Sequence, residues 1–256
     1  MEYSLIQYFF IFTMVCFAGF VDSIAGGGGL ITVPTYIAMG VPSELILGTN
    51  KTVSTSGGII SVYRYIRSSG LDFKILIYGI IGGVIGSSFG AHLATMLDSN
   101  KMVYILVIVV PVIFALNIYK SRLKSDHVIS LSRFALLLRC FLIGLVIGCY
   151  DGFFGPGTGT FLIVAMVLFM NMEIHHASAN ARIINFTSNI TAFAIFLIKG
   201  LIAWKIALVA IIASIIGNYI GSSFVVSGNT KVVKKVFNSV LLGLLIKSAY
   251  DIYLLS

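Results

Sequence analysis

Charged side chains are scarce in this sequence, and their scarcity decides its class. Asp, Glu, Lys and Arg make up 10% of the chain and hydrophobic residues 58%, whereas a soluble domain carries about 25% charged residues. Four windows lack charged residues, and each is close to the length of about 20 residues that a membrane-spanning helix needs. These windows are Tyr3–Val21, Ile75–Leu97, Met102–Tyr119 and Ile206–Thr230. The composition therefore excludes a separate soluble domain and predicts one all-α integral membrane protein.

The motifs of several other classes are missing too. The three cysteines lie in apolar runs without metal-type spacing, so we expect no metal and no other cofactor. The Gly-x-Gly-Asp of intramembrane aspartyl proteases does not occur, and Gly48–Thr52 lacks the Gly-Lys of a phosphate-binding loop. We therefore expect no enzyme. The first apolar run lacks the basic start of a cleavable signal, so we expect it to remain as a helix.

The basic residues give the chain a net charge of +8, yet they do not indicate a nucleic-acid partner. They cluster in short segments beside the apolar windows, as the topology signals of a multi-pass membrane protein do. The expected partners are therefore the lipid bilayer and a small substrate. Assembly into a homo-oligomer is left open.

Two related stretches combine a carboxylate with a glycine run at membrane depth. Residues 19–29 read GFVDSIAGGGG, and residues 148–159 read GCYDGFFGPGTG. Unwound backbone in a bilayer occurs only where it is buried in protein or lines a cavity, and an intramembrane carboxylate is a functional group by default. We expect both stretches to interrupt helices at the centre of a transport site.

These stretches belong to a longer internal duplication. When the two halves are aligned, acidic residues match acidic residues, basic match basic and glycine matches glycine. The matched residues are Gly19 with Gly148, Asp22 with Asp151, Gly26 with Gly155 and Glu44 with Glu173 at an offset of 129, then Lys51 with Arg182, Phe73 with Trp204, Lys74 with Lys205, Gly86 with Gly217 and Gly90 with Gly221 at an offset of 131. Duplicated halves are usual in secondary transporters. We predict two pseudo-symmetric repeats, 1–120 and 134–256, joined by a basic cytoplasmic linker over 121–133.

Each repeat is predicted to hold one broken helix and three transmembrane helices, about eight hydrophobic helices in all. The first repeat has an opening helix to about residue 25, a short piece over 30–39, and helices over 43–68, 73–96 and 101–120. The second has an opening helix over 134–150, a short piece over 160–171, and helices over 173–198, 204–226 and 231–254.

The basic residues also bear on the orientation of the two repeats. Arg64, Arg67 and Lys74 surround the loop after the first long helix, whereas the matching loop has Lys199 and Lys205 alone. Because cytoplasmic loops are rich in Lys and Arg, this asymmetry favours inverted repeats with re-entrant short pieces. A parallel arrangement is left open.

The polar residues beside the breaks form the candidate site. Lys51 and Arg182 each lie about two turns into the helix that follows a break, and Asn185 and Asn189 share the face of Arg182. The substrate-binding candidates are Lys51, Arg182, Thr49, Asn50, Asn180, Asn185, Asn189, Gly26, Gly27, Gly28, Gly29, Gly155, Gly157, Thr158 and Gly159. Asp22 and Asp151 are expected to balance the cations or to carry protons.

Two interpretations of this set stand side by side. Two cations, amide and hydroxyl donors and backbone N–H groups at helix N-termini would bind an anion, Arg as a fork and Lys as a point charge. Alternatively, Asp22 pairs with Lys51 and Asp151 with Arg182 only to neutralise each other, in a structural or sensory membrane subunit.

Several of these motifs together resemble a known family. They are GFVDSIAGGGGLITVP at 19–34, GTNK at 48–51, YDGFFGPGTGTF at 150–161 and ANARIINFTSN at 179–189. The set resembles the TauE/SafE sulfite exporter family, over nearly the whole chain, although Arg182 stands where that family often has lysine. The resemblance implies a multi-pass permease of the bacterial inner membrane that exports a small sulfur oxoanion such as sulfite, or a related organosulfur anion. Proton coupling and an unrelated small anion are left open.

Overall fold

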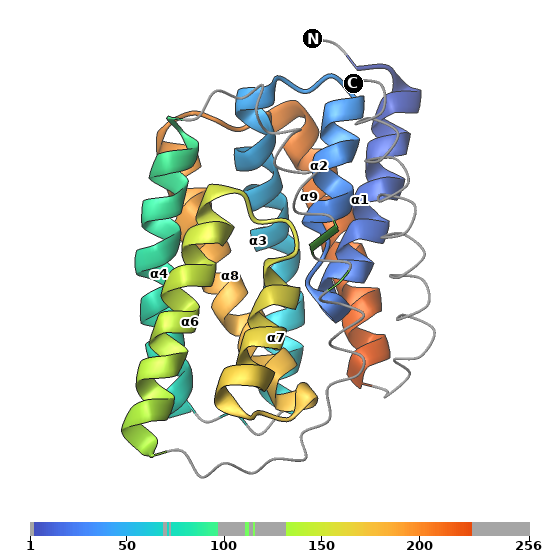
Figure 1. Ribbon diagram of the computed structural model, residues 1–256. Coiled ribbons are helices and arrows are strands. Elements are labelled where there is room, and N and C mark those ends of the chain that lie inside the picture. The colour runs from blue at the N-terminus through green and yellow to red at the C-terminus, as the bar shows by residue number, and fades with distance from the viewer. Residues whose placement is uncertain are drawn as a thin grey trace.

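The computed structural model describes residues 3–68, 71, 73–96, 111–112, 115 and 132–226, and every element within them is helical (Figure 1). The helices are α1 (Leu5–Ala25), α2 (Gly29–Ala38), α3 (Ser43–Ser68), α4 (Phe73–Ala94), α6 (Arg133–Phe153), α7 (Thr158–Met170), α8 (Ile174–Ile198) and α9 (Trp204–Val226). The expected helix over 231–254, nearly all of the expected linker and all but residues 111–112 and 115 of the expected helix over 101–120 lie outside the described residues.

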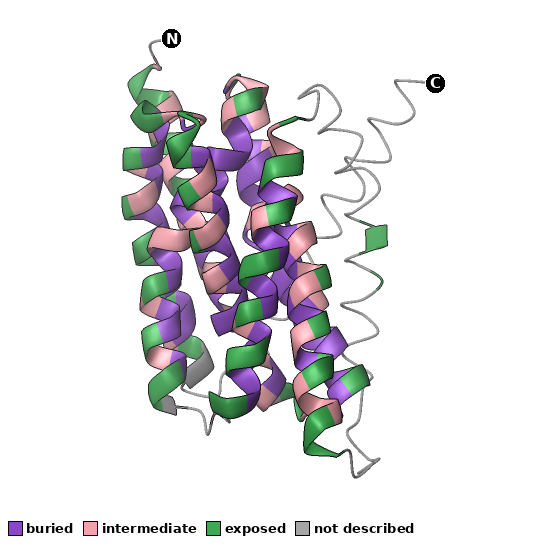
Figure 2. Cartoon of the chain, turned by 90° about the vertical axis from the view of Figure 1, so that its left-hand side faces the viewer, coloured by how far each residue is buried: buried purple, intermediate pink, exposed green. Residues whose placement is uncertain are grey.

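Five of these helices are long and apolar enough to cross a bilayer, namely α1, α4, α6, α8 and α9. Their outward faces carry large apolar side chains such as Phe9, Ile77 and Leu208, while the buried residues face the inside of the bundle (Figure 2). α3 has 26 residues but also carries the polar side chains of the interior. The chain is a multi-pass helical membrane protein, as predicted.

Both predicted breaks are present, and glycine makes them. α1 begins with a capping box between Ser4 and Gln7 and ends at Gly26, which has a φ of 72°. The second break holds Gly155 at a φ of 96° and Gly157 at 84°. A residue with a Cβ adopts this left-handed backbone at a cost that glycine avoids.

The two broken pairs run in opposite directions (Figure 1). α1 descends from the end of the bundle where the N-terminus lies, and α2 climbs back toward that end, whereas α6 rises from the other end and α7 returns to it. Neither short helix continues the crossing that its opening helix begins. Each broken pair is therefore a hairpin whose two outer ends lie at the same end of the bundle.

Helices from residues 5–94 pack between and against helices from residues 133–226. α1 packs along α9, and α4 packs along α6. α3 also contacts α9, and α8 also contacts α4. α3 and α8 contact each other. Glycine permits the close approach of α4 to α6, because a Cβ at Gly82, Gly86 or Gly90 would overlap a backbone carbonyl of α6. Gly217 faces α1 in the same way. These glycines therefore allow the helices to pack closely, as small residues do between membrane helices.

The breaks themselves meet inside the bundle. A Cβ at Gly26 would overlap the Cα of Gly159, and a Cβ at Gly159 would overlap the Cα of Gly26. A Cβ at Gly29 would lie 3.0 Å from the Cα of Pro156. The ends of α1 and α6 and the starts of α2 and α7 are thus held together, backbone against backbone, beside α3 and α8.

Candidate functional site

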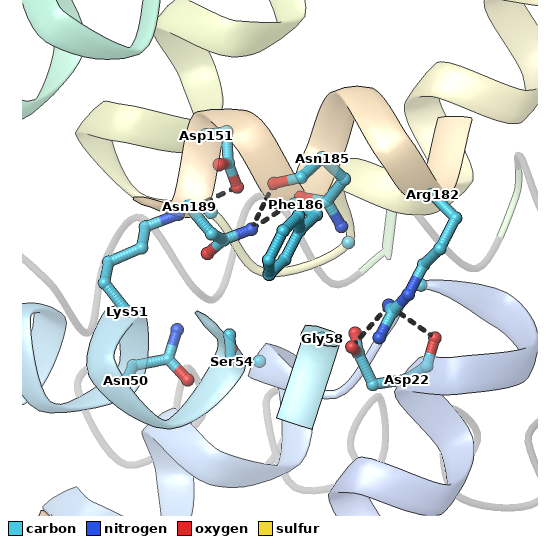
Figure 3. A pocket seen from close by; sticks show the side chains of 14 residues that line it. Asp22, Asn50, Lys51, Ser54, Gly58, Asp151, Arg182, Asn185, Phe186 and Asn189 are labelled. Atoms are coloured by element: carbon cyan, nitrogen blue, oxygen red, sulfur yellow. Dashed lines mark hydrogen bonds and ion pairs between the residues drawn. The ribbon is translucent and has the colours of Figure 1, made fainter. Parts of the chain in front are cut away.

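A polar pocket lies where the two breaks face α3 and α8 (Figure 3). It measures about 380 Å³ when its open side is counted. Its lining comes from both breaks and from both long helices. The lining residues are Asp22, Gly26, Gly29, Asn50, Lys51, Ser54, Gly58, Asp151, Gly155, Gly157, Arg182, Asn185, Phe186 and Asn189.

The two cations and two carboxylates in this pocket pair crosswise. Lys51 Nζ lies 2.8 Å from Asp151 Oδ1, and Arg182 Nη1 lies 2.6 Å from Asp22 Oδ2. The expected pairs, Asp22 with Lys51 and Asp151 with Arg182, were therefore wrong. The interlocking of the helices is the reason, because α1 ends beside α8 and α6 ends beside α3.

Arg182 uses its whole guanidinium on protein partners. Nε and Nη2 donate to Ser61 Oγ at 2.8 and 2.6 Å, and Nη2 also donates to Asn218 Oδ1 at 2.7 Å. Nη1 donates to Asp22 Oδ2 at 2.6 Å and to the Asp22 carbonyl at 3.1 Å. A guanidinium has five N–H donors, and these contacts account for all of them.

Lys51 is buried, as Arg182 is, but fewer of the N–H groups of its ammonium group have partners among the described residues. Among the described residues Asp151 is the one partner of Nζ, although an ammonium group has three N–H donors. A Cβ at Gly155 would lie 2.5 Å from Nζ. Gly155 therefore leaves the space that the ammonium group fills.

The two aspartates also hold the breaks in shape. Asp22 Oδ1 accepts a hydrogen bond from the Gly28 N–H at 3.1 Å, just before α2. Asp151 Oδ1 accepts one from Thr158 Oγ1 at 2.8 Å, at the first residue of α7, and its Oδ2 accepts one from Ser188 on α8 at 2.6 Å. Each carboxylate thus ties an opening helix to the short helix that follows it.

The remaining polar groups of the pocket are mainly donors. Asn50 Oδ1 accepts from Thr32 Oγ1 at 2.5 Å, and Asn185 Oδ1 accepts from Asn189 Nδ2 at 2.7 Å. The Nδ2 groups of Asn50 and Asn185 and the hydroxyl of Ser54 make no hydrogen bond within the described part of the chain, and all three residues line the pocket. Their N–H and O–H groups remain available to a ligand.

Six of the predicted binding residues do not line the pocket. Thr49 accepts a hydrogen bond from the Ala203 N–H at 2.9 Å, and Asn180 donates to the His176 carbonyl at 2.8 Å. Thr49 thus ties α3 to the chain before α9, whereas Asn180 bonds within α8. The other four are Gly27, Gly28, Thr158 and Gly159, which belong to the breaks themselves.

Three lining residues were missed by the sequence analysis, namely Ser54, Gly58 and Phe186. Ser54 and Gly58 stand 131 residues before Asn185 and Asn189. The offset of the duplication could therefore have identified both. The described residues hold no group of three or more His, Cys, Asp or Glu that could bind a metal ion.

Comparison with known proteins covers almost the whole chain. The family model described as Sulfite exporter TauE/SafE matches residues 11–248. A probable membrane transporter protein of Haemophilus influenzae is 32% identical over 91% of both chains. The probable membrane transporter protein YfcA of Escherichia coli K12 is 31% identical over 94% of this chain and 89% of its own. No solved structure matches. The chain therefore belongs to the TauE/SafE sulfite exporter family.

Proposed function

We propose that this protein is a secondary transporter that carries a small oxoanion, such as sulfite or a related organosulfur anion, through the pocket between the breaks. One observation carries the proposal: a buried ammonium group, Lys51, faces a pocket in which most polar groups without a partner among the described residues are donors. The name of the matching family and the names of the relatives point the same way.

The donors favour an anion over a cation or a neutral solute. Within the described ranges, Lys51 has two N–H groups without a partner, Asn50 and Asn185 have their Nδ2 groups, and Ser54 has its hydroxyl. A buried donor without an acceptor costs about 1–3 kcal/mol. The oxygens of an oxoanion would accept from several of these groups at once, and charge-assisted bonds to the Lys51 ammonium group are the stronger kind.

The starts of the two short helices add partial positive charge to this set of donors. Gly29 and Gly157 line the pocket at the start of α2 and α7. Most N–H groups of these first turns, such as those of Leu30 and Thr160, already donate to carbonyls of the breaks, but the helix dipole still favours negative charge there. Because α2 and α7 start beside the same pocket from opposite sides, both short helices direct this positive end toward one ligand.

We also propose that the two halves are inverted repeats. The opposite directions of the α1–α2 and α6–α7 hairpins and the crosswise ion pairs support this arrangement. In such folds the substrate site lies between the repeats, and rocking of one repeat against the other exposes it to each side in turn. The Lys51 and Arg182 pairs would then each connect one repeat to the other.

Counterflow in proteoliposomes tests the proposal. Vesicles containing the purified protein are loaded with unlabelled sulfite and diluted into trace labelled sulfite, with sulfate, chloride and sulfoacetate as competitors. We expect uptake that saturates and that sulfite itself competes away, and repetition across a pH gradient reports any proton coupling. Folded protein that exchanges none of these anions would instead support the structural or sensory subunit.

A further inference from the structure

We infer that the two ion pairs of the pocket do different work: Lys51 forms the ligand-binding end, whereas Arg182 and Asp22 form a fixed clasp that the ligand does not touch. This inference rests on the proposed anion transport. It makes the two ends of the pocket different, because the ligand binds at only one of them. It departs from the expectation that both cations bind the anion.

The first argument is the occupancy of the donors. All five N–H groups of Arg182 have acceptors in the protein, with distances of 2.6–3.1 Å. An anion could bind the guanidinium only by displacing Ser61, Asn218 or Asp22, and the displaced group would lose a buried charge-assisted bond. Lys51 can bind an anion with the two N–H groups that have no partner among the described residues, while it keeps Asp151.

The second argument is that the acceptors of Arg182 are absent from the equivalent places around Lys51. Ser61 corresponds to Ala192 at the offset of 131, and Asn218 corresponds to Ser87. Ala192 has no polar side chain, and Ser87 donates its hydroxyl to the Ser188 carbonyl at 2.6 Å. The sequence therefore supplies acceptors around the arginine and lacks them at these two equivalent positions around the lysine.

The third argument is separation along α8. Asp22 meets α8 at Arg182 and Asp151 meets it at Ser188, six residues further on, which is about 9 Å along a helix. Phe186 lies between these positions in the sequence, and its ring stands between the two ion pairs in Figure 3. Gly58 leaves room for this ring, because a Cβ there would lie 2.7 Å from its Cδ2 atom.

The free donors gather at the lysine end. Asn50 precedes Lys51 on α3, and Ser54 follows it by one turn. Asn185 and Asn189 bond to each other on α8, beside the turn that holds Asp151 through Ser188. This end therefore suits a compact anionic group held by one point charge and several amide N–H groups, and not a planar carboxylate gripped by an arginine fork.

Two matched double variants test the inference, each with one pair neutralised: Lys51→Met with Asp151→Asn, and Arg182→Met with Asp22→Asn. A third variant, Arg182→Lys, keeps the charge but has fewer donors. Binding of labelled sulfite and the melting temperature without ligand are measured in detergent for each. We expect Lys51→Met/Asp151→Asn to lose sulfite affinity by about 30- to 100-fold. We expect Arg182→Lys to change the affinity less than about threefold but to lower the melting temperature by at least about 4 °C.

The stability measurement keeps this test separate from that of the proposed function. Wild-type protein that binds no sulfite, sulfate or sulfoacetate overturns the proposed function and the ligand-binding role of Lys51 together. The clasp is judged without ligand, and it is overturned if Arg182→Met/Asp22→Asn is no less stable than Lys51→Met/Asp151→Asn. A folded Arg182→Lys protein whose sulfite affinity falls as far as that of the Lys51 variant overturns the inference while the proposed function stands.

Discussion

Asp151 connects four helices through a single carboxylate. It extends from α6, accepts from Thr158 on α7 and Ser188 on α8, and pairs with Lys51 on α3. Removing one partner of such a buried pair strands the other charge, at a cost of about 3–5 kcal/mol. The identity of the true partner therefore decides which second substitution can restore stability.

The crosswise pairing predicts a specific rescue. Lys51→Met alone should lower the melting temperature strongly, and adding Asp151→Asn should recover most of the loss because no unpaired charge remains. Adding Asp22→Asn to Lys51→Met is the matched control and should not rescue, since Asp22 belongs to Arg182. Thermal unfolding of the purified variants measures both effects. Rescue by Asp22→Asn in place of Asp151→Asn would contradict the observed pairs.

Gly155 predicts a second effect at the scale of one residue. Gly155→Ala should destabilise for two reasons, a φ of 96° and a Cβ that would reach Lys51 Nζ. Gly200→Ala is the control, since it shares a positive φ of 69° but has nothing within 4 Å of an added Cβ. The strain alone is worth roughly 1–2 kcal/mol. If the melting temperatures of the two variants fall equally, Gly155 does not serve to make room for Lys51.

Among the elements, the sequence predicts the breaks well and the partners of the helices poorly. Glycine runs locate the ends of α1 and α6, and the predicted bounds 43–68 and 204–226 coincide with α3 and α9. α6 extends to Phe153, three residues beyond its predicted end, because Gly152 packs against α4 and does not end the helix. Local sequence cannot reveal which helices interlock, and so the ion pairs were assigned within each half.

The sequence likewise predicts some residues of the candidate site and misses others. Lys51, Arg182 and the two aspartates could be predicted because charges at membrane depth are conspicuous. The acceptors Ser61 and Asn218 could not, since serine and asparagine occur in many helices and only the fold places them against Arg182. Phe186 is one apolar residue among many in its helix, and nothing local distinguishes it from a packing residue.

The contact between α4 and α6 predicts an effect at the scale of the helix. Gly86→Ala should destabilise the protein although alanine favours helices, because the added Cβ overlaps the Leu145 carbonyl. Ile85→Ala on the exposed face of the same helix is the control and should change the melting temperature little. Equal stability of Gly86→Ala and wild type would show that α4 and α6 can separate without loss.

For the whole molecule, the orientation of the two halves is the open structural prediction. Gly40 and Asn171 correspond at the offset of 131, and both end a short helix with a positive φ, 69° and 54°. In Figure 1 the end of α2 and the end of α7 lie at opposite ends of the bundle. Inverted repeats therefore place these two positions on opposite sides of the membrane, whereas parallel repeats would place them on the same side.

Single cysteines test this orientation. In a protein whose native cysteines are replaced by alanine, Gly40→Cys and Asn171→Cys are exposed to a membrane-impermeant thiol reagent in intact cells. The basic residues near the end of α3 and the start of α6 indicate that the α7 end is cytoplasmic. We expect labelling of Gly40→Cys in intact cells and of Asn171→Cys only after permeabilisation. Labelling of both in intact cells would refute the inverted arrangement.

The most direct test of the central claim is sulfite counterflow by the charge-neutral variant Lys51→Met/Asp151→Asn beside wild type. Both proteins are reconstituted at equal density after their folding is confirmed by a single cooperative melting transition. We expect saturable exchange by wild type and none above protein-free vesicles by the variant, because the folded pocket then lacks the Lys51 ammonium group that faces it. Exchange by the folded variant at the wild-type rate would contradict the assignment of Lys51 and this pocket to anion transport.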